Sequence, residues 1–369
     1  MDITKLKAQD FINEFQPMVQ SLDEARKGTQ TRKPIEVTFE ELVKGKWGIS
    51  MDELYEKIGI NPKVDTMENI FTMPQQNVRW LVPEIIRAAV TLGMRRAPFY
   101  PNIISSDQPI NGLTAIMPMV NMSEATPAKV NEAETIPLGD VSFGQKTVTL
   151  FKIGKGFKLT DEVRNYVSLD VLAIYLRDYG VQLGYALDTL AMDVLINGNK
   201  PDGSESAPVI GVYETTKGIT YKDLLHIWVR GARMGRNYTT MIGGEDQAIE
   251  MLNLPEFKDK SYGTTTATLN VHSPIPNRAD FYIHPGTPDQ QLVLIDTSAA
   301  LIKLTAKQLT MESERIVSNQ TNAIYTTLTT GFSKIYQDAV LMLAANQEFS
   351  TMGFPEFMNI DPFFSVGLE

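Results

Sequence analysis

Cysteine is absent from this chain of 369 residues. Its absence excludes disulfide bridges, thiolate metal sites and a cysteine nucleophile, so the fold is indifferent to the redox state of its surroundings. Stability must therefore come from packing and from association with other chains. With 43% hydrophobic residues, the chain is long enough to bury a core and to form two or more structural units.

Long apolar runs and an excess of basic residues are also missing. No stretch approaches the roughly 20 apolar residues that span a bilayer, and the first residues lack the features of a secretory signal. We therefore expect no contact with a membrane. The net charge of −10 argues against a dedicated reader of nucleic-acid sequence, because such domains usually carry a basic stripe that replaces phosphate counterions.

One glycine- and lysine-rich stretch, IGKGFKLTDE, has the composition of a phosphate-binding loop. A P-loop needs G-x-x-x-x-G-K-[ST], and Gly154-Lys155-Gly156 fails that spacing. The dinucleotide pattern G-x-G-x-x-G also fails, because Leu159 occupies the third glycine position. We expect instead a bend or β-bulge in which Gly154 and Gly156 relax the backbone, followed by a short helix capped by Thr160.

Residues suited to catalysis or metal binding are few and scattered. His226, His272 and His284 have no metal-ligand spacing, and no G-x-S-x-G motif anchors a nucleophilic serine. The loop Asn197–Glu205 is rich in oxygen ligands, but Pro201 breaks the EF-hand order, so a plain turn is expected. The sequence predicts no catalytic residue, no cofactor and no metal site.

The first half of the chain predicts helices and one long hairpin. Residues 1–63 are polar, with short amphipathic pieces, and indicate short helices on an extended arm without a core of its own. A helix is expected to start around Pro83 and to stop at Pro98 and Pro101, with an extended exit. Residues 112–122 and 141–158 alternate like strands and predict a two-stranded hairpin whose tip, 123–137, has no periodicity. An isolated hairpin is marginally stable, so it must lie on something.

A long helix and a mixed domain follow. Leucines recur at spacings of three and four from Ser168 to Ile196, which predicts an amphipathic helix with Ser168 at its N-cap. Gly180 and Gly184 lie one turn apart and would let another backbone approach. Further elements are expected as helices at 221–236 and 246–252, strands at 239–242, 281–284 and 291–295, and a late threonine-rich β-region.

Two blocks of sequence are the most specific part of the chain. The first is ETIPLGDVSFGQKTVTLFKIGKGFKLTDEVRNYVSLDVLAIYLRDYGVQLGYALDTLAMDVLINGN, continued by ESAPVIGVYET. The second is MESERIVSNQTNAIYTTLTTGFSKIYQDAVLML. Both resemble the tailed-bacteriophage major capsid protein family. The first is similar to the family's outgoing strand, its turn starting T/S-D/N-E, its spine helix ending in a Gly/Asn turn, and its P-x-x-G entry into the next domain, and the second to its C-terminal strands.

The resemblance implies an α+β fold, the tailed-phage capsid fold that encapsulins share. Its implied parts are an N-terminal arm and leading helix (1–101), an extended hairpin loop (102–160), the spine helix of a peripheral domain (161–210), an axial α/β domain (211–298), and C-terminal strands of the peripheral domain with a tail (299–369). Because the chain begins at Met1, the arm is expected to be retained during maturation.

The implied function is structural and not enzymatic. The chain would assemble into hexamers and pentamers of an icosahedral shell, made in the host bacterial cytoplasm, that encloses double-stranded DNA without reading its sequence. Portal, scaffolding and decoration proteins are its implied partners. A cross-link between Lys129 or Lys146 and Asn319 or Asn322 of a neighbour fits by residue type only and is not expected.

Two alternatives remain open at this point. An encapsulin, a bacterial shell around protein cargo, would share the fold, although the long arm and hairpin favour the phage capsid. An α/β enzyme would need a nucleophile, a base or a phosphate loop that the sequence does not display.

Overall fold

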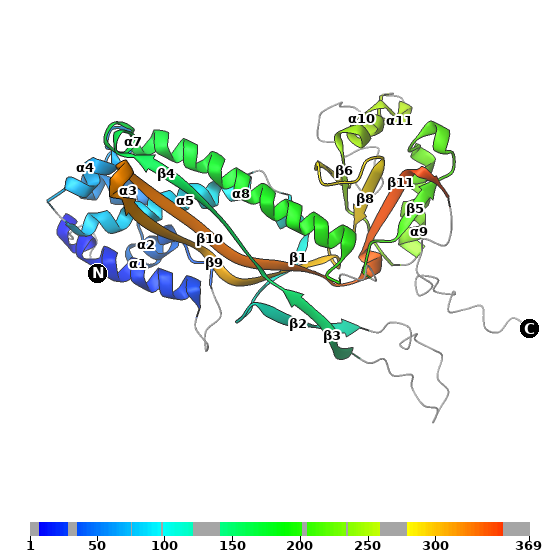
Figure 1. Ribbon diagram of the computed structural model, residues 1–369, viewed down its shortest axis with the longest axis horizontal. Coiled ribbons are helices and arrows are strands. Elements are labelled where there is room, and N and C mark those ends of the chain that lie inside the picture. Colours follow the sequence, from blue (N-terminus) through cyan, green and yellow to red (C-terminus); the bar gives the residue numbers. More distant parts are fainter. Residues whose placement is uncertain are drawn as a thin grey trace, which may run out of the picture.

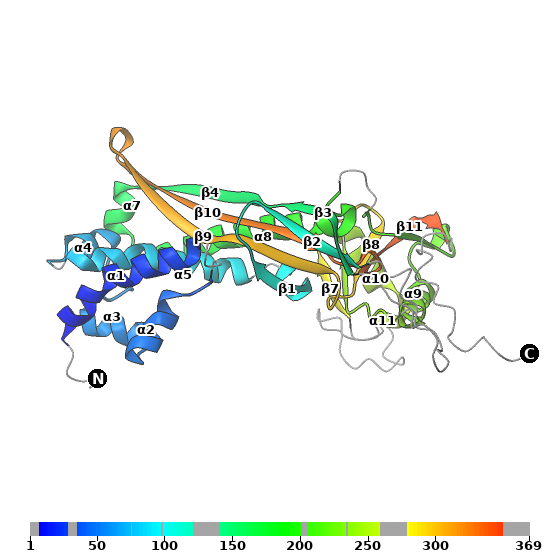
Figure 2. The same cartoon turned by 90° about the horizontal axis from the view of Figure 1, so that it is seen from below.

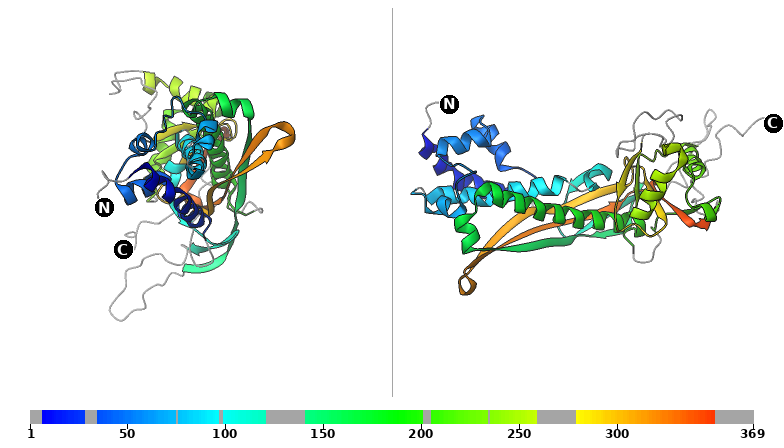
Figure 3. Two further views of the ribbon diagram at one scale, coloured as in Figure 1. Left: turned by 90° about the vertical axis from the view of Figure 1, so that its left-hand side faces the viewer. Right: turned by 90° about the horizontal axis from the view of Figure 1, so that it is seen from above.

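The protein is an elongated mixture of helices and sheets, as the computed structural model in Figure 1 shows. The structure describes residues 7–28, 35–74, 76–96, 99–120, 141–200, 205–233, 235–258 and 279–349. A four-stranded sheet and a long helix run along the body, and a five-stranded sheet forms a second unit. Figure 3 shows the N-terminal helices and the second unit at opposite ends of the long axis. The predicted α+β class is confirmed.

Four helices form the N-terminal end: α1 (Ala8–Lys27), α2 (Phe39–Trp47), α3 (Met51–Ile58) and α4 (Met67–Thr72). Local sequence sets the boundaries of the middle two. Thr38 and Ser50 each accept a hydrogen bond in a capping box, which satisfies free N–H groups of the first turn. Gly48 and Gly59 end the same helices in the left-handed conformation, which glycine adopts without steric cost.

The expectation of an extended arm without a core is wrong for this segment. Phe11, Phe15 and Trp47 are buried and meet edge to face, with ring centroids 5.0 Å apart for Phe11 and Trp47 and 6.5 Å apart for Phe15 and Trp47. Apolar positions on α1 recur every three or four residues, and that stripe packs into the core of the same chain. The charged residues between them obscured the stripe in the sequence.

Helix α5 (Leu81–Arg96) packs along the long helix α8 (Leu169–Asn197). The two backbones touch, because a Cβ atom on Gly180 would lie 2.2 Å from the Val90 carbonyl oxygen, and one on Gly93 would lie 2.1 Å from that of Arg177. The predicted long helix is confirmed, and so is the close approach at Gly180. Ser168 is at the N-cap as expected, without a side-chain capping bond.

The four-stranded sheet has the order β1-β9-β10-β4. Its strands are β1 (Ile104–Pro109), β9 (Leu301–Ile316), β10 (Thr321–Lys334) and β4 (Phe151–Thr160). The sheet is antiparallel except for β1, which pairs with β9 in parallel. Figure 2 shows β4, β9 and β10 following the direction of α8. The hydroxyl of Tyr179 on α8 meets that of Thr326 on β10 at 2.6 Å, which joins helix to sheet.

The glycine- and lysine-rich stretch is a regular strand, so the predicted bend is wrong. Strand β4 pairs with β10 without a register shift from Thr160 opposite Thr321 to Phe151 opposite Thr330. A Cβ on Gly156 would lie 2.8 Å from the Tyr325 ring, so this glycine makes room for a cross-strand side chain. Thr160 does cap the short helix α7 (Asp161–Tyr166), accepting the Val163 N–H at 3.4 Å.

The predicted hairpin is confirmed in its paired part. Strands β2 (Thr114–Val120) and β3 (Val141–Thr149) are antiparallel, from Thr114 opposite Thr149 to Val120 opposite Val141. The returning strand leaves the hairpin at Leu150 and continues as β4 in the main sheet, so the hairpin is shorter than predicted. The predicted tip, 123–137, lies outside the described residues.

The second unit is a five-stranded sheet with the order β5-β11-β8-β6-β7. Its elements are β5 (Val209–Val212), α9 (Tyr221–Arg233), β6 (Thr240–Gly243), α10 (Glu245–Asn253), α11 (Pro255–Lys258), β7 (Asp280–Ile283), β8 (Gln291–Ile295) and β11 (Val340–Glu348). The predicted helices and strands between 221 and 295 are confirmed. Strand β11 was expected beside the spine helix, but it pairs with β5 and β8.

Short elements complete the chain. They are α6 (Tyr100–Ile103) and the 3-10 turns Gln76–Trp80, Thr215–Lys217, Val317–Asn319 and Gln337–Ala339. The expected extended exit after α5 is therefore a short helix followed by β1.

Candidate assembly surfaces

The hairpin has one face turned to the subunit and one to solvent. Val148 and Leu150 are buried against Leu304 of β9, because alternate residues of a strand point to opposite faces. On the other face Ile116 is 65% exposed. Figure 1 shows the hairpin on the far side of the sheet from α8. In its described side chains, the hairpin thus packs against the rest of the chain by one face and leaves the other exposed.

Helix α8 is also apolar on two sides. Leu172, Leu176 and Leu183 are buried against the body. Other apolar residues of α8 are exposed and point away from the body. We call them the outer apolar face of α8: Val171, Ile174, Tyr175 and Tyr185. Tyr175 is 68% exposed. A helix that is apolar on more than one side is normally covered on each of them, and this subunit covers one.

The second unit carries a further set of exposed apolar side chains. Leu225 and Val229 lie one turn apart on α9, and Ile249 and Leu252 lie one turn apart on α10. Val229 is 70% exposed and Ile249 69% exposed. Single exposed apolar residues are ordinary, but pairs at helical spacing form stripes that suit contact with another protein.

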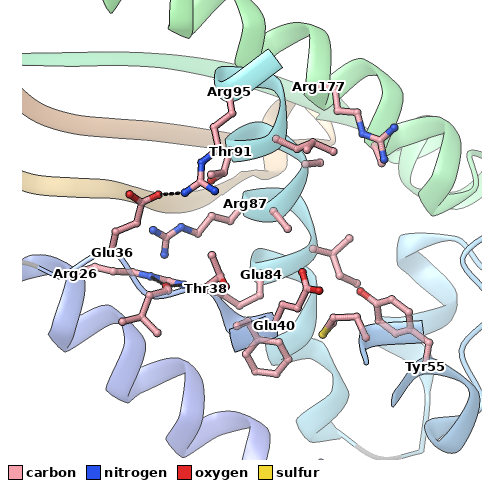
Figure 4. Close-up of a pocket in the computed structure, with 18 residues that line it drawn as sticks. Arg26, Glu36, Thr38, Glu40, Tyr55, Glu84, Arg87, Thr91, Arg95 and Arg177 are labelled. Atoms are coloured by element: carbon pink, nitrogen blue, oxygen red, sulfur yellow. Dashed lines mark hydrogen bonds and ion pairs between the residues drawn. The ribbon is translucent and has the colours of Figure 1, made fainter. Parts of the chain in front are cut away.

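The cavity in Figure 4 lies among α1, α3, α5 and α8 and has a volume of about 370 Å³. The buried Arg26 guanidinium donates to both carboxylate oxygens of Glu84, at 2.7 and 2.9 Å, and to the Val37 carbonyl oxygen at 3.0 Å. Burial raises the pKa of the Tyr55 phenol at the edge of the cavity. The two hydrogen bonds between Arg26 and Glu84 tie α1 to α5.

The two histidines that the structure describes, His226 and His284, lie in separate environments. The His226 ring lies edge-on to Tyr213 and Phe349, with centroids 5.4 and 4.7 Å apart. His284 is buried, accepts the Gly286 N–H at Nδ1 over 3.0 Å, and has its pKa lowered by burial. The third candidate, His272, lies outside the described residues. The two described histidines are not brought together into a site.

The loop after α8 is held by its asparagine. The Asn199 amide donates to the Phe332 carbonyl oxygen at 2.7 Å and accepts the Lys334 N–H at 3.1 Å. The Asn199 N–H donates to the Glu205 carboxylate at 3.1 Å. These bonds join the turn to β10. In the described part of the chain, no three His, Asp or Glu side chains form a group that could hold a metal ion.

One buried carboxylate, that of Asp188, was not predicted from the sequence. Asp188 on α8 accepts the backbone N–H groups of Phe99 and Tyr100, at 3.4 and 2.9 Å, where α6 begins. Burial raises the pKa of this carboxyl to about 6. Its position next to Leu187 on the apolar side of α8 was the signal available in the sequence. The carboxylate positions the backbone between α5 and β1.

Three of the four residues considered for a cross-link lie in the described part of the chain. Lys146 belongs to β3, whereas Asn319 lies in the turn between β9 and β10, at the far end of the long sheet (Figure 2). Asn322 pairs with Leu159 and Arg315 in the sheet. Lys129 lies outside the described residues.

No helix among the described residues has the length and apolar character needed to cross a bilayer.

The comparisons found likeness in structure and none in sequence. No protein-family model and no curated protein matches the chain. Among solved structures, a virus-like particle from Pyrococcus furiosus is 10% identical with a TM-score of 0.47, over 70% of this chain and 98% of that one. The capsid of the cyanophage P-SCSP1u is 11% identical with a TM-score of 0.48, over 68% and 88%. The holo-SrpI encapsulin complex from Synechococcus elongatus is 9% identical with a TM-score of 0.46, over 69% and 91%. The matched structures include a phage capsid and an encapsulin. The likeness concerns the fold alone.

Proposed function

We propose that this chain is the major capsid protein of a tailed bacteriophage, which assembles as hexamers and pentamers into an icosahedral shell around double-stranded DNA. The parts of the molecule have the roles that the resemblance implies: the hairpin reaches toward a neighbour, α8 is the spine, and the second unit lies near the centre of each capsomer. Portal, scaffolding and decoration proteins are the further partners that the proposal includes.

The observation behind the proposal is the apolar surface that the described part of the chain leaves exposed to solvent. The solvent-facing side of the β2–β3 hairpin, the outer apolar face of α8 and the stripes on α9 and α10 lie on separate elements along the molecule. A closed dimer needs one such surface, whereas a lattice needs several, because each subunit has several different neighbours. Exposed apolar area of this kind is stabilised by association.

The charge of the chain fits a container for DNA. A net charge of −10 disfavours tight binding to the phosphate backbone of DNA. A shell that confines DNA does not need to bind it tightly. Contact with the packaged DNA is then weak and independent of base sequence.

Electron microscopy of the purified protein tests the proposal. We expect icosahedral shells, tubes or hexameric rings. A chain that stays a monomer or dimer at every salt concentration would contradict it. The contents of shells isolated from the native host separate the two kinds of container, since a phage capsid holds double-stranded DNA and an encapsulin holds protein cargo.

Deletion of residues 123–137 tests the role of the hairpin. We expect the shortened subunit to remain folded, with an unchanged circular dichroism spectrum, and to lose assembly into shells or rings. Loss of soluble, folded protein would show that this segment belongs to the core of its own subunit.

A further inference from the structure

A second cavity, of about 400 Å³, lies between α5 and the strands β1 and β9. It shares Glu36, Arg87, Thr91 and Arg95 with the cavity of Figure 4. Its wall carries the cations Arg87, Arg95, Lys303 and Lys307 and the anions Glu36 and Asp107. The cavity is therefore lined by more positive than negative side chains.

The anions of the wall are already matched to two of the cations. Arg95 pairs with Glu36 at 2.6 Å, and Lys303 pairs with Asp107 at 2.8 Å. Arg87 and Lys307 remain, and within the described chain neither makes a hydrogen bond or an ion pair. Arg87 is only 8% exposed, and Figure 4 shows it on the same side of α5 as Arg95 and Glu36. A buried guanidinium without an anion is costly.

Two neutral side chains that can donate hydrogen bonds line the same cavity as these cations. Thr91 lies one turn after Arg87 on α5, so both side chains are on the same side of the helix. Gln308 follows Lys307 on β9, and both line the cavity. Neither Thr91 nor Gln308 makes a side-chain hydrogen bond in the described part of the chain. Four donors from two elements thus face one space.

An irregularity of β9 explains how adjacent residues can line the same cavity. In the pairing with β10, Thr310 lies opposite Thr327, Lys307 opposite Thr329, and Thr305 opposite Thr330. Strand β9 therefore contains an extra residue on each side of Lys307, which makes two β-bulges. Neighbouring residues of a regular strand point to opposite faces, and a bulge re-aims them.

We propose that this cavity binds a tetrahedral oxyanion of the phosphate class. Arginine offers a planar pair of N–H donors to such an ion, and lysine adds a point charge. The Thr91 hydroxyl and the Gln308 amide would complete the set of donors. The bound ion would neutralise Arg87 and join α5 to β9. The site is independent of the shell function proposed above.

Calorimetric titration of the full-length protein with inorganic phosphate, in chloride buffer of constant ionic strength, tests the site. We expect saturable binding, competition by sulfate, and a rise in melting temperature that saturates with phosphate. Arg87→Gln and Lys307→Gln should each weaken binding by about tenfold or more. Lys152→Gln is the matched control, because Lys152 is exposed on β4 and lines neither cavity.

Three outcomes would overturn the proposal. They are the absence of saturable binding to the wild-type protein, an equal thermal shift with chloride alone, and an equal loss of affinity in Lys152→Gln. If Arg87→Gln fails to fold, Lys307→Gln still decides, because Lys307 is partly exposed and its replacement leaves no buried gap. Calorimetry tests the phosphate site and electron microscopy tests the shell function, so either proposal can be contradicted without the other.

Discussion

The N-terminal helices and the β2–β3 hairpin are both segments that the sequence predicts to need neighbouring subunits. In the structure they differ. Phe11, Phe15 and Trp47 of the helices are buried within their own chain, whereas Ile116 of the hairpin is 65% exposed. The same contrast divides α8, whose inner leucines are covered and whose Tyr175 is not. Apolar content alone thus does not identify the surfaces that another chain could cover; burial separates the core residues from the exposed candidates.

We expect substitutions of buried residues to change the free energy of unfolding, and substitutions of exposed apolar residues to change assembly. Glu84→Ala should have the largest effect on stability, because it leaves the Arg26 guanidinium buried without its carboxylate. We expect a loss of about 3–5 kcal/mol in the free energy of unfolding, measured by urea denaturation. Glu14→Ala is the control, since Glu14 and its partner Lys46 are exposed, and should cost about 0–1 kcal/mol. Equal losses would show that the buried ion pair contributes no more to stability than the exposed one.

Gly180→Ala tests the contact between α5 and α8. Alanine normally stabilises a helix by about 1 kcal/mol relative to glycine. Here its Cβ would meet the Val90 carbonyl oxygen at 2.2 Å, so we expect a net loss of about 1–3 kcal/mol by the same measurement. Gly45 of α2 has open space around its Cβ position, and Gly45→Ala should gain roughly 0.5–1 kcal/mol. A gain at both positions would show that the helices are not in backbone contact.

Asp188 should make stability depend on pH. Burial raises the pKa of its carboxyl from 3.8 to about 6, so the folded state holds more protons than the unfolded state in that window. The contribution of Asp188 to the free energy of unfolding therefore falls as the pH rises from about 4 to about 6 and is constant above. In Asp188→Asn this fall should disappear, although the variant loses one hydrogen-bond acceptor at every pH. Asp178→Asn, on the exposed side of α8, should keep the wild-type profile.

Substitutions on the outer apolar face of α8 should have the smallest effect on stability. For Ile174→Ser and Tyr175→Ser we expect the free energy of unfolding to stay within about 0.5 kcal/mol of the wild type, with shells or rings reduced in electron micrographs. The neighbouring change Leu176→Ala, on the buried side, should cost about 2–5 kcal/mol. Normal assembly by both serine variants would remove this face from the proposed contacts.

Much of the fold could be predicted from local sequence. Leucines at helical spacing and the N-cap at Ser168 marked α8, Thr160 marked the start of α7, and alternation marked β2 and β3. The spacing of Gly154 and Gly156 fits neither nucleotide-binding motif, and the structure places both glycines in the regular strand β4. These features depend on residues close to one another in the chain, where propensity and capping act.

Pairing between distant segments could not be predicted in the same way. Local alternation does not say that β4 leaves the hairpin to pair with β10, or that β11 joins the sheet of the second unit. The partner of Arg26 lies 58 residues away at Glu84, and the donors of the oxyanion cavity come from α5 and β9. No spacing in the sequence connects them.

Residue identity and short-range geometry fix the type of most elements, exclude disulfides and thiolate sites, and give the molecule its acidic charge. Which apolar residues lie inside and which stay exposed could be read only from the folded chain, because burial depends on how distant segments pack. The same type of apolar residue is core on one side of α8 and exposed surface on the other.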